Sequence, residues 1–282
     1  MSDPWLDTLL LEAWLWRALV TAVLVAVPCA VLGVFLVLRR RSTVADAQAH
    51  LALPGIVLAY LATGSTAPFV MLGGALVVGL GGGLGIEALI ARARIRPDAA
   101  VGLVYAPLFA LGVVLLSAFV RDAHIDVQCV LFGDVLGVAD TTLLTLAIVT
   151  PAVLVVVVVV WRWLVWTAFD ELHARAHGVP IALVHRGVMA LVAVVAVTSF
   201  EAAGAVLVVA LLVVPGATAH LVSRSPLAMV GLAAGHAVLS SVLGLGLSIA
   251  LDCSTAGAMV AVAGALYGLV RWVVARRGQG IA

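Results

Sequence analysis

The sequence contains no lysine and little charge of any kind. Its fifteen basic residues are all arginine, and charged residues make up 10% of the 282-residue chain. Soluble domains carry about 25% charged residues, so the composition excludes an ordinary soluble domain. A Walker phosphate-binding loop needs a lysine after its glycines, so the absence of lysine also excludes ATP hydrolysis by that route.

Cysteine is scarce as well. The three cysteines, Cys29, Cys129 and Cys253, are far apart and form no CxxC pair. We therefore expect neither a disulfide framework nor a thiolate metal site. The formal net charge of +1 gives no basic patch of the kind that attracts nucleic acid, so no nucleic-acid partner is expected.

Apolar residues, in contrast, make up 65% of the chain. Runs long enough to cross the roughly 30 Å hydrocarbon layer of a membrane recur along almost the whole length. The predicted fold class is all-α, a polytopic transmembrane helical bundle that forms one domain over residues 1–282. We expect nine spans, or eight if one pair is misread, at 13–38, 44–63, 67–91, 99–120, 141–166, 181–199, 203–222, 227–250 and 256–275. A shorter apolar element, 127–138, is too short to cross.

The arginines are distributed unevenly among the predicted loops. Arg121 falls clearly on one side, and Arg17 is ambiguous near the start of the first span. Eleven others lie in alternate loops or at helix ends that face those loops: Arg39 to Arg41, Arg92, Arg94, Arg96, Arg175, Arg186, Arg224, Arg276 and Arg277. Because cytoplasmic loops carry the excess of basic residues, we expect the N-terminus outside and the C-terminus in the cytoplasm.

A carboxylate and an imidazole stand four residues apart where the second span begins. One helical turn is about 3.6 residues, so Asp46 and His50 project from the same face. A charge at the centre of a bilayer costs roughly 3 kcal/mol or more, so an ionisable pair in a membrane helix is expected to have a specific role. The spacing is compatible with two roles: a capping box formed by Thr43 and Asp46, or a pair of ligands for a divalent cation.

Four segments, in chain order, resemble features of the permease subunits of metal-ion ABC importers, the family that carries zinc, manganese and iron(II). The first is a basic loop followed by Asp, His and small residues, and the second is an extracytoplasmic Leu-Phe-Gly-Asp. The third is a cytoplasmic segment that docks on the ATPase, and the fourth is an apolar run that ends in Pro-small-Ala-Thr-Ala. They are Arg39 to Gly55, Leu131 to Asp134, Phe169 to Pro180 and Gly204 to Ala219.

The resemblance implies a type II ABC importer-like permease in the cell membrane. It implies that Asp46 and His50 are metal ligands in the transport pathway, and that zinc, manganese or iron(II) is cargo rather than a permanent cofactor. Expected partners are cytoplasmic ATPase subunits, which would hydrolyse the ATP, and an extracytoplasmic metal-binding protein. The docking loop would be 167–180, with ATPase coupling through Phe169, Asp170, Glu171, Ala174, Arg175, Ala176 and Gly178.

One chain supplies only one oxygen and one nitrogen ligand from this turn, which is too few to strip a dication of most of its water. A two-fold homodimer with the pathway on its axis would double the set. Such a mixed set suits zinc, manganese or iron(II), and ligand type does not choose among them. Because protons compete with metal for an imidazole, import is expected to fall at acidic pH.

Four other ionisable groups lie within or near the spans. His220 closes the seventh span at the cytoplasmic face, where water can solvate it. His236, near the middle of the eighth span, is either hydrogen-bonded to a neighbouring helix or part of the pathway. Glu201, at the start of the seventh span, could attract cations to an external mouth. Glu87 is expected to pair with Arg92 or another nearby arginine.

The residues argue against two alternative functions. A permease for a chelated metal, such as a siderophore or corrin, needs a wide pathway and no paired metal ligands, so Asp46 and His50 argue against it. An intramembrane enzyme is disfavoured because the sequence has no HExxH, no GxSxG and no obvious Ser–His dyad.

Overall fold

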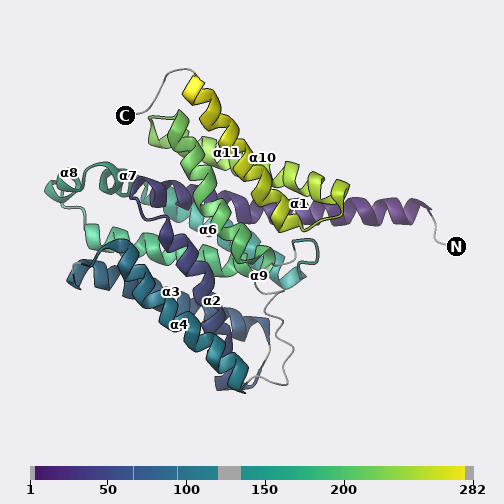
Figure 1. Ribbon diagram of the computed structural model, residues 1–282, viewed down its shortest axis with the longest axis horizontal. Coiled ribbons are helices and arrows are strands. Elements are labelled where there is room, and N and C mark those ends of the chain that lie inside the picture. The colour runs from purple at the N-terminus through teal and green to yellow at the C-terminus, as the bar shows by residue number, and fades with distance from the viewer. Residues whose placement is uncertain (1–3, 66, 94, 120–134, 277–282) are drawn as a thin grey trace.

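The computed structural model describes residues 4–65, 67–93, 95–119 and 135–276, and within these ranges it contains helices and connecting turns but no strand (Figure 1). The helices are Pro4–Leu38 (α1), Thr43–Thr63 (α2), Pro68–Ala93 (α3), Pro97–Phe119 (α4), Asp140–Val159 (α6), Trp161–Phe169 (α7), Glu171–Ala176 (α8), Ile181–Val222 (α9), Pro226–Leu251 (α10) and Thr255–Arg276 (α11).

Eight of the described helices are long and apolar enough to cross a membrane, which confirms the all-α polytopic prediction. The two expected spans 181–199 and 203–222 both lie in α9, a helix of 42 residues. At 1.5 Å per residue α9 is about 63 Å long, roughly twice the hydrocarbon thickness. It is interrupted at Gly204, whose φ of 73° and ψ of 164° are accessible to glycine but not to ordinary side chains. The predicted boundary between these two spans is therefore present as a break within one helix.

The predicted span 141–166 is too long. Helix α6 ends at Val159, and Val160 leaves the helical conformation at φ −94° and ψ 9° before α7 begins. The 20 residues of α6 already cross about 30 Å, and the following Trp161, Trp163 and Trp166 are typical of a membrane interface. Arg121 and Cys129 lie outside the described residues, as do residues 127–134 of the short apolar element, which include the Leu-Phe-Gly-Asp segment.

Helices α1 and α9 run through the middle of the bundle, with α2, α3 and α4 on one side and α10 and α11 on the other (Figure 1). The two central helices touch backbone to backbone. A Cβ on Gly33 would overlap the carbonyl oxygen of Leu212, and a Cβ on Gly216 would lie 3.0 Å from the carbonyl of Gly33. Small residues permit such close approach, which maximises dispersion contacts where lipid supplies no hydrophobic driving force.

Helices α2 and α4 lie side by side and run in the same direction. The hydroxyl of Thr43, at the start of α2, donates to a carboxylate oxygen of Asp98, at the start of α4, at 3.1 Å. Farther along, a Cβ on Gly112 would lie 2.8 Å from Pro54. These contacts hold α4 against α2 over most of its length, and therefore beside Asp46 and His50.

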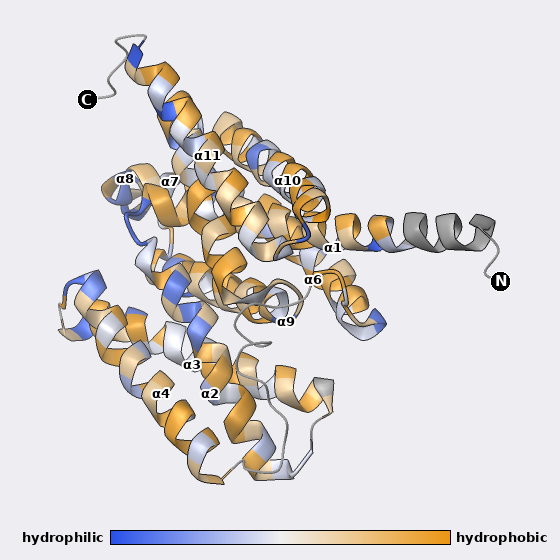
Figure 2. Cartoon of the chain, turned by 45° about the vertical axis from the view of Figure 1, so that its right-hand side comes forward, coloured by the Kyte–Doolittle hydropathy of each residue, from blue (hydrophilic) through white to orange (hydrophobic). Residues whose placement is uncertain are grey.

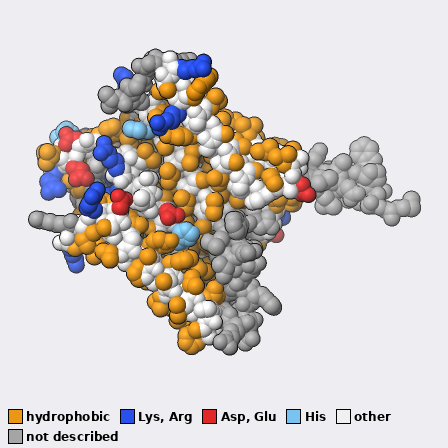
Figure 3. All heavy atoms as spheres, in the orientation of Figure 1, with side chains coloured by type: hydrophobic (Ala, Val, Ile, Leu, Met, Phe, Trp, Pro, Cys, Tyr) orange, Lys and Arg blue, Asp and Glu red, His pale blue; other side chains and the backbone are white. Residues whose placement is uncertain are grey.

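The outer faces of the bundle are apolar, and the basic side chains gather at one end. Figure 2 shows hydrophobic residues along the long helices, and only 17% of the most apolar stretches of α4 and α11 is buried. Figure 3 shows most of the visible arginines over the end that carries α7 and α8 and toward the end of α11. An apolar belt with one basic end is what a multi-pass membrane protein requires.

The α1–α9 crossing generates a stability prediction. Gly33→Ala should lower the free energy of unfolding by about 1–3 kcal/mol, because the new methyl group overlaps the backbone of α9. Gly231→Ala is the matched control, since a Cβ there meets nothing within 4 Å. Thermal unfolding in detergent should show a lower midpoint for Gly33→Ala only. Equal midpoints for the two variants would contradict the backbone contact.

Candidate functional site

Asp46 and His50 lie on one face of α2, within its first three turns. The Nε2 atom of His50 is 3.5 Å from the Oδ1 atom of Asp46, which is ion-pair range rather than a short hydrogen bond. The Asp46 side chain is 55% exposed in the single chain and that of His50 is 23% exposed. Both side chains are therefore reachable from the surface of one protomer.

The capping-box prediction for this turn is wrong. Ser42 occupies the N-cap position, and its side chain makes no capping hydrogen bond. The Thr43 hydroxyl is directed to Asp98 on α4 instead. Among the described residues, the polar partner of the Asp46 carboxylate is His50 alone. Within the part of the chain that the structure describes, the carboxylate is thus not used to start the helix.

Two aromatic residues of α4 hold the imidazole of His50. Its ring centroid is 5.6 Å from that of Tyr105 and 5.5 Å from that of Phe109. Its Nδ1 atom is buried and has no hydrogen-bond partner among the described residues. The sequence gives no sign of either aromatic residue, because nothing in its pattern pairs α4 with α2.

One chain does not complete a metal site. Across the described residues, no group of three or more His, Cys, Asp and Glu side chains is placed to hold a metal ion. Asp46 and His50 offer two ligands, whereas protein sites for transition metals normally use at least three. A half-exposed carboxylate on an apolar bundle must meet water or another protein surface, since lipid would not solvate it.

The structure does not bring His236 or Glu201 to this pair. His236 is buried on α10, a helix that packs against α1, α9 and α11. The Glu201 carboxylate accepts a hydrogen bond from the hydroxyl of Thr142 on α6, at 2.8 Å. Neither has a described contact with Asp46 or His50, so both remain separate from the α2 site.

The predicted docking segment contains a short helix, α8, as expected. The Asp170 carboxylate accepts from the backbone N–H of His173 at 2.9 Å, which caps the start of the helix. Gly178, at φ 73°, ends it, and the N–H of Val179 donates to the carbonyl of Ala174 at 3.0 Å. Ala174 of α8 is buried, whereas Phe169 at the end of α7 and Leu172 of α8 are 56% and 80% exposed. Two large apolar side chains are therefore exposed at this end of the molecule.

Glu87 pairs with an arginine, but the partner is Arg41 rather than Arg92. The Nη1 atom of Arg41 lies 2.6 Å from Oε2 of Glu87, and only 13% and 8% of the two side chains is exposed. His185 on α9 lies against the same carboxylate, with Nδ1 3.4 Å from Oε1. A buried carboxylate requires such partners, because desolvation without them would be strongly unfavourable.

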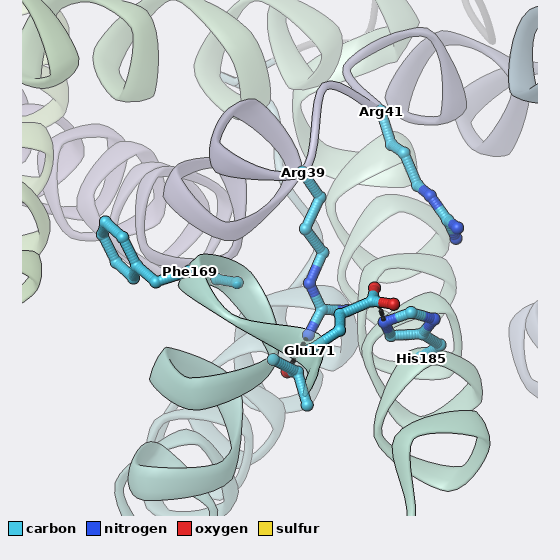
Figure 4. A pocket seen from close by; sticks show the side chains of 7 residues that line it. Arg39, Arg41, Phe169, Glu171 and His185 are labelled. Atoms are coloured by element: carbon cyan, nitrogen blue, oxygen red, sulfur yellow. Dashed lines mark hydrogen bonds and ion pairs between the residues drawn. The ribbon is translucent and has the colours of Figure 1, made fainter. Parts of the chain in front are cut away.

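A pocket of about 160 Å³ opens beside this ion pair, between the α1–α2 turn and the α7–α8 segment (Figure 4). Arg39 reaches across it and donates from Nη2 to the Thr167 hydroxyl at 2.5 Å. Burial, and then the neighbouring Arg41, lower the pKa of Arg39 to about 10. The guanidinium therefore remains cationic at neutral pH.

These features define a class of protein: a multi-pass helical membrane protein, with a carboxylate–imidazole pair on a helix of its bundle and a short helix exposed at its basic end. Residues 12–274 match the ABC 3 transport family, and the chain belongs to that family.

Similar proteins cover almost the whole chain. It is 35% identical to the manganese transport system membrane protein MntC of Halalkalibacterium halodurans, over 96% of this chain and 91% of that one. It is 36% identical to the zinc transport system membrane protein TroD of Treponema pallidum, over 88% and 71% of the two chains. A solved structure, PsaBC from Streptococcus pneumoniae in complex with Fab, matches with a TM-score of 0.79 and 32% identity, over 91% of this chain and 90% of that one.

The Arg41–Glu87 pair generates a second prediction. Glu87→Ala should destabilise the protein by about 3–5 kcal/mol, because it leaves a buried guanidinium without its counter-charge. Asp140→Ala, which removes a pair with Arg17 whose side chains are 51% and 87% exposed, should change stability by less than about 1 kcal/mol. Thermal midpoints in detergent compare the two, and similar midpoints would contradict the buried pair.

Proposed function

We propose that this permease moves divalent transition-metal ions into the cytoplasm, and that Asp46 and His50 bind the ion on its way. The observation that carries the proposal is the geometry of α2: a carboxylate and an imidazole share one face, 3.5 Å apart, and neither is used to cap the helix. An oxygen and a nitrogen donor suit manganese, zinc and iron(II). Relatives named for manganese and zinc transport support the same cargo class.

A second copy of the chain completes the site in this proposal. Two chains related by a two-fold axis supply two carboxylates and two imidazoles, provided the axis passes beside α2. The exposure of Asp46, at 55% in the single chain, supports a site that another protein surface or a water-filled path covers. Because a transport site must also release its ion, a shared and partly open set is better suited than a closed structural cage.

ATP hydrolysis takes place on separate cytoplasmic subunits in the proposed assembly, and an extracytoplasmic binding protein delivers the metal. The docking loop 167–180 contacts the ATPase through α8 and its flanking residues Phe169, Asp170, Glu171, Ala174, Arg175, Ala176 and Gly178. The exposed Phe169 and Leu172 support this role, since an apolar side chain at a cytoplasmic surface favours burial in a partner's groove. Closure of the ATPases would then shift the bundle between outward-open and inward-open states.

The proposed orientation puts the end that carries α7 and α8 in the cytoplasm. Helix α1 begins at the opposite end of the molecule (Figure 1), so the N-terminus would be outside. The gathering of arginines over the α7–α8 end supports this orientation through the positive-inside bias (Figure 3). His236 and Glu201 are not needed by the proposed site.

A chelated cargo is the less favoured alternative. A siderophore or corrin already fills the coordination sphere of its metal, so a permease for such cargo gains nothing from a carboxylate–imidazole pair. The aromatic packing that fixes His50 against α4 also suits a small ion better than a bulky chelate.

Removal of either ligand should abolish metal import. Asp46→Ala and His50→Ala should each lower import of manganese or zinc by at least about tenfold, because each removes half of a shared ligand set. His220→Ala and Asp140→Ala are matched controls, since both alter exposed side chains away from α2. Metal accumulation in cells that express equal amounts of each variant measures the effect. Parental uptake by Asp46→Ala or His50→Ala would remove the proposed site.

Import should also depend on pH through metal affinity. A protonated imidazole cannot bind metal, so the metal concentration for half-maximal import should rise as pH falls from neutral to about pH 5.5. Proteoliposomes that contain the complete transporter, assayed with manganese and zinc separately, provide the measurement. A half-saturating concentration that stays constant over this range would argue against His50 as a ligand.

A further inference from the structure

A pair of histidines stands on the short helix α8, outside the helices long enough to span a membrane. His173 lies in the middle of α8, and His177 directly follows its last residue, Ala176. The backbone N–H of His177 donates to the carbonyl of His173 at 3.1 Å, so the turn between them is α-helical. Residues four apart on a helix lie on one face, and both of these histidines are exposed.

The two imidazole rings lie against each other. Their centroids are 4.2 Å apart, and their planes are inclined by 38°. Both rings also pack on the indole of Trp166 on α7, at centroid distances of 5.3 Å for His173 and 5.2 Å for His177. Because packing on a neighbouring helix restricts side-chain rotation, the two rings are held together rather than free in solvent.

A hydrogen bond of His177 determines which of its nitrogens is available. Its Nδ1 atom is 2.9 Å from the carbonyl oxygen of His173. A carbonyl only accepts hydrogen bonds, so Nδ1 carries the proton, and the neutral ring keeps a lone pair on Nε2. Histidines that bind metal usually have this arrangement, in which the other ring N–H donates to a carboxylate or a backbone carbonyl. His177 is therefore oriented as a metal ligand through Nε2.

No protein group competes for the remaining ring nitrogens. Across the described ranges of the chain, the bond from Nδ1 to the carbonyl is the only hydrogen bond that either ring makes. Asp170 and Glu171 stand at the start of α8, and Arg175 belongs to the same helix. Arg162 stacks on Trp166, with its Cζ atom 4.3 Å from the ring centroid. The charges of these two carboxylates and two guanidiniums sum to zero, so together they do not oppose a bound cation.

Two imidazoles one helical turn apart are a ligand pair for the later first-row divalent ions. Imidazole suits zinc, copper and nickel, whereas manganese prefers oxygen ligands. The same spacing supplies two of the zinc ligands in an HExxH helix. Two nitrogens on one tetrahedral zinc ion lie about 3.3 Å apart, because each Zn–N bond is about 2.0–2.1 Å long. Rings whose centroids are 4.2 Å apart are compatible with that spacing.

We propose that His173 and His177 form a second metal site, which binds zinc or another divalent ion that prefers imidazole and leaves the remaining coordination positions to water. The site differs from the α2 pair in place and in ligand type, since the protein supplies two nitrogens and no oxygen. Its position on the cytoplasmic side rests on the proposed function and orientation. An ion bound there lies within the segment 167–180 that is proposed to dock on the ATPase, so an occupied site changes the charge of that surface.

Zinc binding to the full-length permease in detergent, free of any histidine tag, tests the site without a transport step. The His50→Ala background removes the α2 pair, and equilibrium titration of that variant should give one zinc ion per chain. His173→Phe and His177→Phe keep an aromatic ring against Trp166 but remove the ligand nitrogens, so each should weaken zinc binding by at least about tenfold. His220→Phe is the matched control, since it changes an exposed histidine on α9 and should leave zinc binding unchanged.

X-ray absorption at the zinc edge of the His50→Ala protein gives a second readout that does not depend on how well the α8 variants fold. It should show two imidazole nitrogens at about 2.0–2.1 Å from the zinc ion. A spectrum without imidazole ligands, or zinc binding that His173→Phe and His177→Phe leave unchanged, would overturn the site. Failure of the proposed function is distinguishable, because zinc would still bind to α8 if the Asp46–His50 pair bound no transported ion.

Discussion

A half-exposed carboxylate on a helix of an apolar bundle, with an imidazole as its polar partner among the described residues, is the constraint on which the rest of this structure depends. Asp46 has only an imidazole beside it, whereas Glu87 is neutralised by Arg41 at 2.6 Å. An anion in a membrane protein persists where a cation or water compensates it. Glu87 has a permanent cation, so its role is to hold helices together. Asp46 has an imidazole and partial exposure instead, which supports the proposal that a transported cation is its partner.

The surrounding helices fix the position of the Asp46–His50 pair. The Pro54–Gly112 contact and the Thr43–Asp98 hydrogen bond fix α4 beside α2, and the rings of Tyr105 and Phe109 then hold the imidazole. Close backbone contact between α1 and α9 supplies a tightly packed centre, and α2 and α3 pack against α9. The basic end, with α8 and its ion pairs, lies close to the turn that starts α2. Ligand and docking elements are thus connected by a few contacts.

Much of the architecture follows from the sequence because lipid imposes simple rules. Apolar length predicted the spans, and the resemblance to metal-ion permeases located the docking segment that contains α8. The cap at Asp170 and the glycine at φ 73° are local features that need no distant partner. The errors arise where a distant segment decides. Thr43 resembles half of a capping box but donates to Asp98. Glu87, expected to pair with Arg92 or another nearby arginine, pairs with Arg41, 46 residues earlier in the chain. Sequence spacing does not show which helices become neighbours. The contacts of Tyr105, Phe109 and His185 therefore could not be predicted from the sequence.

The most direct measurement of the central claim is the metal-binding stoichiometry of the purified permease in its transport-competent complex. Equilibrium binding of manganese should give one ion per two permease chains, and Asp46→Ala should abolish that binding while the complex stays assembled. One ion bound per chain, or a stoichiometry that Asp46→Ala leaves unchanged, would contradict a site shared between two copies of α2.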